Sequence, residues 1–252
     1  MIVEFIGSTG AGKTTLISEV QRRLAKAAEA TTSFDLVAAP LGLRGVTHPS
    51  ARNLIQELVG LPFFIGSLNR HKTFVAFALR MLARQANFTI FTLNNLRSLE
   101  RKIGVHEIIR RYKRERIILV DEGTVLLAHN VFVYSSAFYT PEEIDKFANL
   151  IPLPDVIVYV RVPMDSLIRR SLQRADPPRE MKSKNRAQIE TYVNRAVTLF
   201  EQLVSAENIR SRVLIVDNPE SADGGCEAAV DTIIEFVLNK DTQHVDQHSQ
   251  AH

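Results

Sequence analysis

The sequence predicts an α/β fold in which crossover helices connect the strands of a parallel β-sheet. Short apolar runs of β-rich composition alternate along the chain with segments of helical periodicity. The strand candidates are almost continuously apolar, which is typical of parallel strands buried on both faces. A length of 252 residues, with 45% hydrophobic and 23% charged residues, suits one large globular domain.

Each expected element can be justified in chain order. Leu16, Ile17, Val20 and Leu24 recur at helical spacing and predict a helix over 13–30, directly after the first apolar run. The segment 41–115 has helical patterning and is too long for a loop in a compact domain, so we expect a helical insertion that lines one side of the site. The strands are predicted over residues 2–6, 34–38, 117–120, 156–162 and 213–216. These elements form one domain, 1–240, and the polar segment 241–252 is expected to be a disordered tail.

Charge and cysteine content exclude several classes of protein. The 31 basic and 28 acidic residues leave a net charge of +3, too small an excess to indicate a nucleic-acid partner. No segment reaches the roughly 18 uninterrupted apolar residues of a membrane span, and the amino terminus lacks the pattern of a secretory signal. One cysteine, Cys226, excludes an intrachain disulfide and suits a reducing compartment, so we expect a cytoplasmic protein.

Glycine is scarce in this chain and clustered at one place. Of its 11 glycines, Gly7, Gly10 and Gly12 lie within six consecutive positions, between the first strand and the first helix. Together with Lys13 and Thr14 they complete the phosphate-binding pattern G-x-x-x-x-G-K-[ST], known as Walker A. We expect this loop to bind the nucleotide through Gly7, Ser8, Thr9, Gly10, Ala11, Gly12, Lys13, Thr14 and Thr15.

The chemistry of a nucleoside triphosphate explains these residue types. Glycines allow the backbone N–H groups to surround the β-phosphate, and the helix that follows adds its partial positive charge. Lys13 is expected to bridge the β- and γ-phosphates, and the Thr14 hydroxyl to bind Mg²⁺. The cofactors predicted are therefore ATP and Mg²⁺.

A pair of carboxylates follows the third strand. Strand 117–120 runs directly into Asp121 and Glu122, at the sheet edge where parallel strands place their ligands. Asp121 is the expected second Mg²⁺ ligand, directly or through water. Either Asp121 or Glu122 could orient or deprotonate the attacking group.

Two functions share these features. A kinase transfers the γ-phosphate to a small molecule, whereas a P-loop ATPase or nucleotide-sensing protein would use Glu122 to activate water. After the fourth strand, Arg170 and Arg174 lie four residues apart, on one face of a helix that enters a proline-containing segment. Such a pair suits a lid, 163–185, that closes on the transferred phosphoryl group, and it favours the kinase.

The chain resembles the P-loop nucleotide and nucleoside kinases, specifically the thymidylate kinase and deoxynucleoside kinase group. The resemblance covers most of residues 1–238. It rests on GSTGAGKTT, on the lid entry VPMDSLIRRSLQR at 162–174, on the helix that begins at Tyr192 and on VLIVDNPE at 213–220. It implies a three-layer P-loop NTPase fold with strand order 2-3-1-4-5, a phosphate loop at residues 7–15, and lid arginines at Arg170 and Arg174.

The acceptor side differs from the family pattern. Family members usually carry an acidic residue followed by arginine after the third strand, whereas here Asp121 is followed by Glu122. Arg44, Arg52 and Arg80 lie in segments that face the acceptor in such kinases and are the candidate substrate residues. The acceptor is expected to be a small molecule of unidentified structure, and a homodimer is left open.

Overall fold

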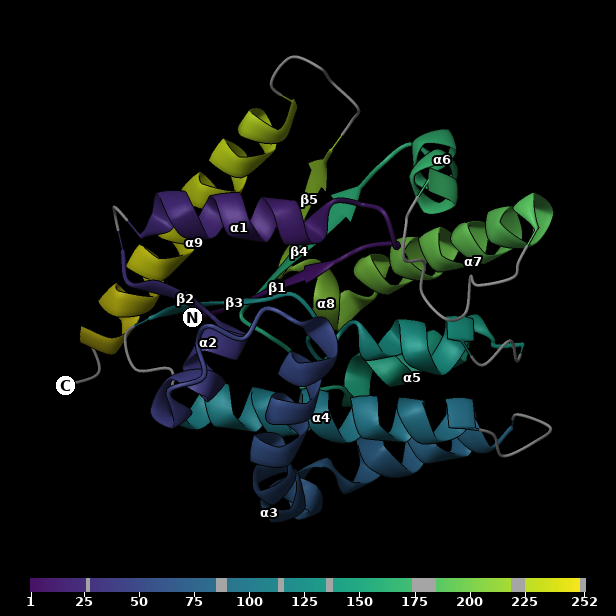
Figure 1. Cartoon of the computed structure of the whole chain (residues 1–252), viewed down its shortest axis with the longest axis horizontal. Helices are drawn as coiled ribbons and strands as arrows, with labels where there is room; N and C mark the ends of the chain where they lie inside the picture. Colours follow the sequence, from purple (N-terminus) through teal and green to yellow (C-terminus); the bar gives the residue numbers. More distant parts are fainter. Residues whose placement is uncertain are drawn as a thin grey trace.

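The computed structural model describes residues 1–25, 28–84, 90–112, 116–134, 138–173, 185–218 and 225–249. At its centre is a five-stranded sheet in the order β2-β3-β1-β4-β5, in which every neighbouring pair is parallel. Helices cover both faces (Figure 1). The predicted fold class and strand order are therefore confirmed. The strands are β1 (Ile2–Ile6), β2 (Ala30–Thr32), β3 (Ile117–Val120), β4 (Val156–Arg161) and β5 (Val213–Asp217).

The register of the sheet brings two sequence motifs to one edge. Ile2 lies opposite Ile118 on β3, and Val3 lies opposite Val156 on β4. Because these strands are parallel, β1 and β3 end at the same edge of the sheet. The loop that follows β1 and the carboxylates that follow β3 therefore leave the sheet side by side.

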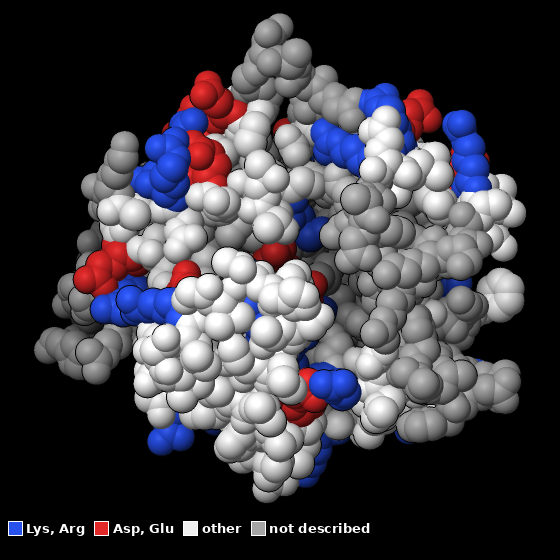
Figure 2. Space-filling view, viewed as in Figure 1, with Lys and Arg blue, Asp and Glu red and all other residues white. Residues whose placement is uncertain are grey.

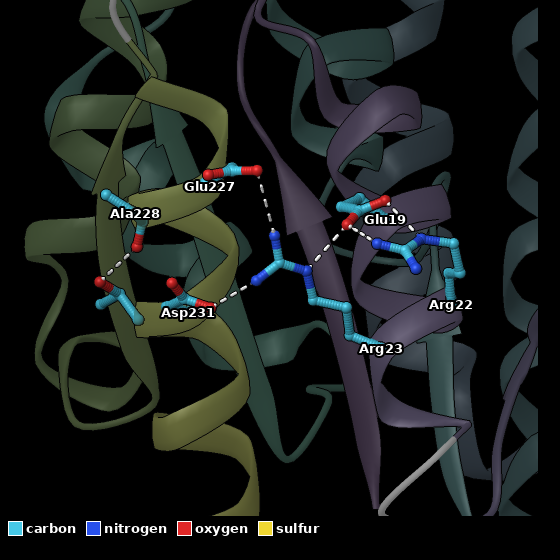
Figure 3. A network of polar contacts seen from close by, with 7 residues as sticks. Glu19, Arg22, Arg23, Glu227, Ala228 and Asp231 are labelled. Carbon is cyan, nitrogen blue, oxygen red and sulfur yellow. Dashed lines mark hydrogen bonds and ion pairs between the residues drawn. The ribbon is translucent and has the colours of Figure 1, made fainter. Parts of the chain in front are cut away.

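Helices α1 (Lys13–Leu24) and α9 (Gly225–Ser249) lie next to each other (Figure 1). The buried side chains Val230, Ile233 and Val237 of α9 belong to the same core cluster as the apolar face of α1. Arg23 of α1 also contacts Glu19 at 2.8 Å and Asp231 of α9 at 2.6 Å (Figure 3). Such exposed ion pairs contribute only about 0–1 kcal/mol each, so the apolar contact provides most of the free energy that holds α1 against α9.

The segment between β2 and β3 is mostly helical. The long helix α3 (Pro49–Ala83) changes direction along its length, as Figure 1 shows, and contains Pro62 in its interior. Proline removes one helical hydrogen bond and crowds the preceding turn, which accounts for the bend. The start of α3 lies near the sheet edge, whereas Arg84, after its end, contacts Glu143 of α5. The remaining helices are α2 (Ser33–Ala38), the 3₁₀ turn η1 (Ala39–Leu41), α4 (Ile90–Tyr112), the π-helical η2 (His129–Tyr134), α5 (Pro141–Leu150), α6 (Met164–Gln173), α7 (Arg186–Ser205) and α8 (Glu207–Arg210).

Two elements differ from the sequence prediction by several residues. The sequence predicts the second strand at 34–38, but these residues belong to helix α2, and the strand is Ala30–Thr32. The Thr32 hydroxyl accepts a hydrogen bond from Asp35 N at 3.1 Å, which caps the helix, and Phe34, Val37 and Ala38 form its buried face. The helix predicted over 13–30 ends at Leu24, because the chain must turn back to form β2.

The carboxyl-terminal helix extends further than the core requires. Helix α9 continues to Ser249, beyond residue 241, where the sequence predicts that a disordered tail begins. No glycine or proline occurs between Cys226 and Ser249 to end it. Within the described residues, no helix combines the length and the hydrophobicity that crossing a membrane requires.

Candidate active site

The loop after β1 forms a cradle of backbone groups. Gly7, Gly10 and Gly12 have φ values of 141°, 86° and 84°, which side-chain-bearing residues rarely adopt. A Cβ atom at Gly7 would lie 2.7 Å from the carbonyl oxygen of Val160. The loop therefore depends on glycine both for its conformation and for its packing against β4.

Lys13 and Ser8 fit a loop that receives an anion. Lys13 Nζ donates to the carbonyl oxygens of Gly7 and Ser8, at 2.9 and 3.1 Å, and so lies across the loop. The Ser8 hydroxyl is buried and has no hydrogen-bond partner among the described residues. A lysine folded over the loop and an unsatisfied hydroxyl in it are compatible with a bound phosphate, which would accept hydrogen bonds from both.

The loop is supported from behind by a residue that the sequence does not single out. Asn218, directly after β5, donates from Nδ2 to the carbonyl oxygen of Ala11 at 2.9 Å, and the same atom lies 2.6 Å from a Cβ built on Gly12. This contact fixes the turn that leads into α1.

The two expected metal ligands lie together. Thr14 Oγ1 donates to Asp121 Oδ2 at 3.0 Å, across the gap between α1 and the end of β3. Loss of hydration raises the pKa of Asp121, although the charge of Lys13 and the Thr14 hydrogen bond oppose this effect. A hydroxyl and one carboxylate fit Mg²⁺, which keeps several waters and binds nucleotide phosphates. No cluster of three or more potential His, Cys, Asp or Glu ligands occurs in the part of the chain that the structure describes.

Glu122 is surrounded by positive charge. Arg101 Nη2 of α4 lies 2.9 Å from Glu122 Oε2, and Lys102 and Lys13 are near enough to act on it. Loss of hydration alone would raise the pKa of Glu122, but the charges of Lys102, Arg101 and Lys13 hold it below its ordinary value. Glu122 is therefore an anion that these cations stabilise.

Beneath these residues lie a buried glutamate and a buried lysine. Glu4 of β1 accepts a hydrogen bond from Leu126 N at 2.9 Å, and a Cβ at Gly123 would lie 2.3 Å from its Oε2. Burial raises the pKa of Glu4 to about 7, and burial lowers the pKa of Lys102 to about 8. Glu4 thus anchors the turn that immediately follows Asp121 and Glu122.

We expect Glu4 to make stability depend on pH. Its folded pKa of about 7 exceeds the ordinary glutamate value of 4.5, so the native state holds a proton that the unfolded state has lost between these values. The contribution of Glu4 to the free energy of unfolding is therefore fully present below pH 4.5. It is lost as the pH rises through 7, and the total loss is roughly 3 kcal/mol. Glu4→Gln should remove this decline when urea unfolding is compared at pH 5 and pH 8. Parallel pH dependences for the two proteins would contradict this assignment.

A cavity of about 430 Å³ opens beside Glu122. Figure 2 shows acidic and basic atoms at the bottom of a hollow near the centre of this face. The cavity walls come from the start of α3, from α4, from the segment between β3 and η2, and from η2 itself. Its lining is Ser50, Asn53, Leu54, Glu57, Asn94, Asn95, Arg97, Ser98, Arg101, Lys102, Glu122, Leu126, His129, Asn130 and Tyr134.

The predicted arginines are distributed unevenly around this centre. Arg170 of α6 donates from Nη1 to the Gly10 carbonyl at 3.1 Å, so it touches the phosphate loop, whereas Arg174 and the rest of the expected lid up to residue 184 lie outside the described residues. Arg52 packs over the Phe34 ring at 4.4 Å and is near enough to lower the pKa of Asp121. The structure does not bring Arg44 or Arg80 to the site.

Arg44 and Arg80 lie in parts of the fold that are remote from the phosphate loop. Arg44 lines a separate hollow with Glu29 and Arg116, at the amino end of β2 and β3, which is the opposite sheet edge from the phosphate loop. Arg80 is exposed in the last turn of α3, 28 residues beyond Arg52. Neither location follows from local sequence, because both depend on how the insertion folds back.

Sequence reasoning missed Lys102, Glu4 and Asn95 as parts of the site. The sequence does contain a signal for Lys102 and Glu4. Lys102 shares a helical face with Leu99 and His106, and Glu4 is the one charged residue in the apolar run 1–6. A charged residue at a position that the apolar pattern predicts to be buried needs a partner of opposite charge or a hydrogen bond. Asn95 carries no such signal, because an asparagine on a helix is ordinarily exposed.

Comparisons with known proteins give only distant similarities. No protein-family model and no curated protein matches the chain. Among solved structures, a shikimate kinase from Bacteroides thetaiotaomicron is similar with a TM-score of 0.47 and 12% identity, over 94% of this chain and 98% of that chain. A thymidylate kinase from Ehrlichia chaffeensis gives 0.46 and 13%, over 94% and 98%. A deoxyadenosine kinase from M.mycoides gives 0.44 and 18%, over 96% and 99%. The fold assignment itself rests on the strand order and the loop between β1 and α1.

Proposed function

We propose that this protein is an ATP- and Mg²⁺-dependent kinase that transfers a phosphoryl group to a small molecule. The observation that carries the proposal is the cavity beside Glu122, which follows Asp121 in the chain, and the polar walls of this cavity come largely from the insertion. A hydrolase needs room for one water molecule, whereas about 430 Å³ is the size of a small-ligand site.

The residues of the chain have separate roles in this proposal. The loop amides and Lys13 bind the β- and γ-phosphates, and Arg170 approaches them from α6, joined by Arg174 when the lid closes. Thr14 and Asp121 would hold Mg²⁺, which when bound neutralises charge on the phosphate oxygens. Asp121 or Glu122 orients the acceptor hydroxyl and takes its proton, and Arg52 stands near Asp121 on the acceptor side. We place this activity in the cytoplasm, where ATP is abundant and the single thiol of Cys226 stays reduced.

The competing function is ATP hydrolysis or nucleotide sensing with Glu122 activating water. The contact of Arg101 with Glu122, at 2.9 Å, lowers the basicity of this carboxylate and so weakens it as a base for a water molecule. The test is incubation with γ-labelled ATP, Mg²⁺ and a panel of nucleosides, nucleotides, sugars and aminoglycosides. We expect label on an acceptor. Release of free phosphate at full rate whether or not an acceptor is present would overturn the kinase proposal.

We also propose that the protein forms a homodimer through α3. Five large aliphatic residues on this helix, each between 37% and 63% exposed, recur at alternating spacings of four and three. This spacing is typical of a helical seam that packs against another copy of itself. Figure 2 shows that the surface over α3 is largely uncharged. The row consists of Leu54, Leu58, Leu61, Ile65 and Leu68.

The dimer proposal predicts a change of mass in solution. Light scattering coupled to size-exclusion chromatography should give twice the chain mass for the wild type and the monomer mass for the double variant Leu58→Glu, Ile65→Glu, because the seam cannot bury two carboxylates. Leu172→Glu, at an exposed leucine of α6, is the matched control and should remain dimeric. A monomeric wild type would refute the proposal.

A further inference from the structure

The cavity beside Glu122 is lined by four side-chain amides. Asn53 comes from α3, Asn94 and Asn95 from α4, and Asn130 from η2. An amide offers donors and an acceptor without charge, so such walls suit a ligand that is recognised by hydrogen bonds.

Two of these amides form a hydrogen-bond chain with a fixed direction. Lys102 Nζ donates to Asn130 Oδ1 at 3.1 Å, and Asn130 Nδ2 donates to Asn95 Oδ1 at 3.1 Å. Because an ammonium group can only donate, Lys102 sets the orientation of Asn130, which in turn sets that of Asn95. The amide nitrogen of Asn95 therefore remains as the free end of the chain.

That free end is buried and unsatisfied. Asn95 is 3% exposed, and its Nδ2 has no hydrogen-bond partner among the described residues. The Nε2 atom of His129, on the same cavity wall, is also buried without a partner in the described part of the chain. A buried polar atom without a partner costs about 1–3 kcal/mol, so both positions favour a ligand that satisfies them.

The cations of the cavity already have partners. Arg97 makes a two-pronged contact with Glu57, at 2.6 and 2.7 Å, and Arg101 contacts Glu122 at 2.9 Å. A ligand with its own phosphate group would compete with these carboxylates for the two guanidinium groups, whereas an uncharged ligand leaves both pairs in place.

From this arrangement, and resting on the proposed kinase function, we infer that the acceptor is an uncharged hydroxyl compound without a phosphate of its own, and that it presents a hydrogen-bond-accepting oxygen or nitrogen to Asn95 Nδ2. Its hydroxyl oxygen forms a bond to the γ-phosphorus as the bond from that phosphorus to the β–γ bridging oxygen breaks. ADP leaves with that electron pair, and the hydroxyl proton passes to the carboxylate of Asp121 or Glu122.

The test does not require the acceptor to be known. A small-molecule filtrate of a cell lysate is divided, and one half is treated with alkaline phosphatase, which is then removed. Both halves are incubated with the wild-type protein, Mg²⁺ and γ-labelled ATP, and labelled products are separated. We expect the treated half to give at least as much labelled product as the untreated half.

Three other outcomes would count against the inference, and they show whether the inference alone or the kinase function itself has failed. Labelled product in the untreated half alone would show that the acceptor carries a phosphate, and would overturn the inference while preserving the kinase. Label only on free phosphate in both halves would remove the proposed kinase function. An absence of any labelled product would have the same consequence.

The role of Asn95 is tested with the labelled acceptor fraction. Asn95→Asp keeps the shape of the side chain and removes its donor, so we expect KM for the acceptor to rise at least tenfold while KM for ATP stays within twofold. Asn69→Ala, at an exposed asparagine of α3 outside this cavity, should change neither. An unchanged acceptor KM in a variant whose melting temperature matches the wild type would exclude Asn95 from acceptor recognition.

Discussion

Lys13→Ala is expected to reduce phosphoryl transfer by a factor on the order of 10² to 10³, the loss typical of removing one preorganised donor to developing charge. Lys13 Nζ already lies across the loop, on the carbonyls of Gly7 and Ser8, where the phosphates would bind. Its charge also favours the ionised forms of Asp121 and Glu122, so the variant loses electrostatic support for both carboxylates.

Binding of ATP should be affected together with turnover. A ligand present at 100 times its dissociation constant stabilises the native state by about 2.7 kcal/mol, which is readily measured as a thermal shift. We expect ATP with Mg²⁺ to shift the wild type and to shift Lys13→Ala much less. Lys72→Ala, at an exposed lysine of α3, is the matched control. A full thermal shift in Lys13→Ala would show that the loop is not the nucleotide site.

The sequence predicts the part of this site that depends on short stretches of chain. Gly7 to Thr14 form a local motif, and Asp121 follows a strand of four apolar residues, so the residue pattern alone places both at the sheet edge. The parallel register then brings Thr14 and Asp121 within 3.0 Å. Whether these groups bind nucleotide and metal stays a prediction.

The acceptor side could not be predicted in the same way. It is built from side chains on two long helices, and their placement depends on the bend at Pro62 and on how closely α3 and α4 approach. Arg44 and Arg80 are candidates by charge and position in the chain, yet they lie away from the cavity. Glu4 and Lys102, which lie beneath Asp121 and Glu122, are recognised as a pair only when β1 and α4 are packed together.

The approach of α3 and α4 rests on two glycines. A Cβ at Gly104 of α4 would lie 2.4 Å from the backbone oxygen of Gly60 on α3, and 2.7 Å from its carbonyl carbon. These are backbone atoms, so the clash can be relieved only if one helix moves. Arg101 and Lys102 stand on the same turns of α4, which links this crossing to the position of the cations at the cavity.

Gly104→Ala is therefore expected to destabilise the protein by about 1–3 kcal/mol through overpacking, despite the better helix propensity of alanine. For a chain of this size each kcal/mol corresponds to about 2–4 °C in melting temperature. Two matched variants separate the effect of packing on stability from the effect of helix propensity. Gly66→Ala meets nothing within 4 Å and should stabilise by up to about 1 kcal/mol. Gly60→Ala, whose nearest neighbour would lie at 3.6 Å, should be close to neutral. If all three variants melted alike, the close crossing of α3 and α4 would not exist in solution, and the walls of the cavity beside Glu122 would have to be placed differently.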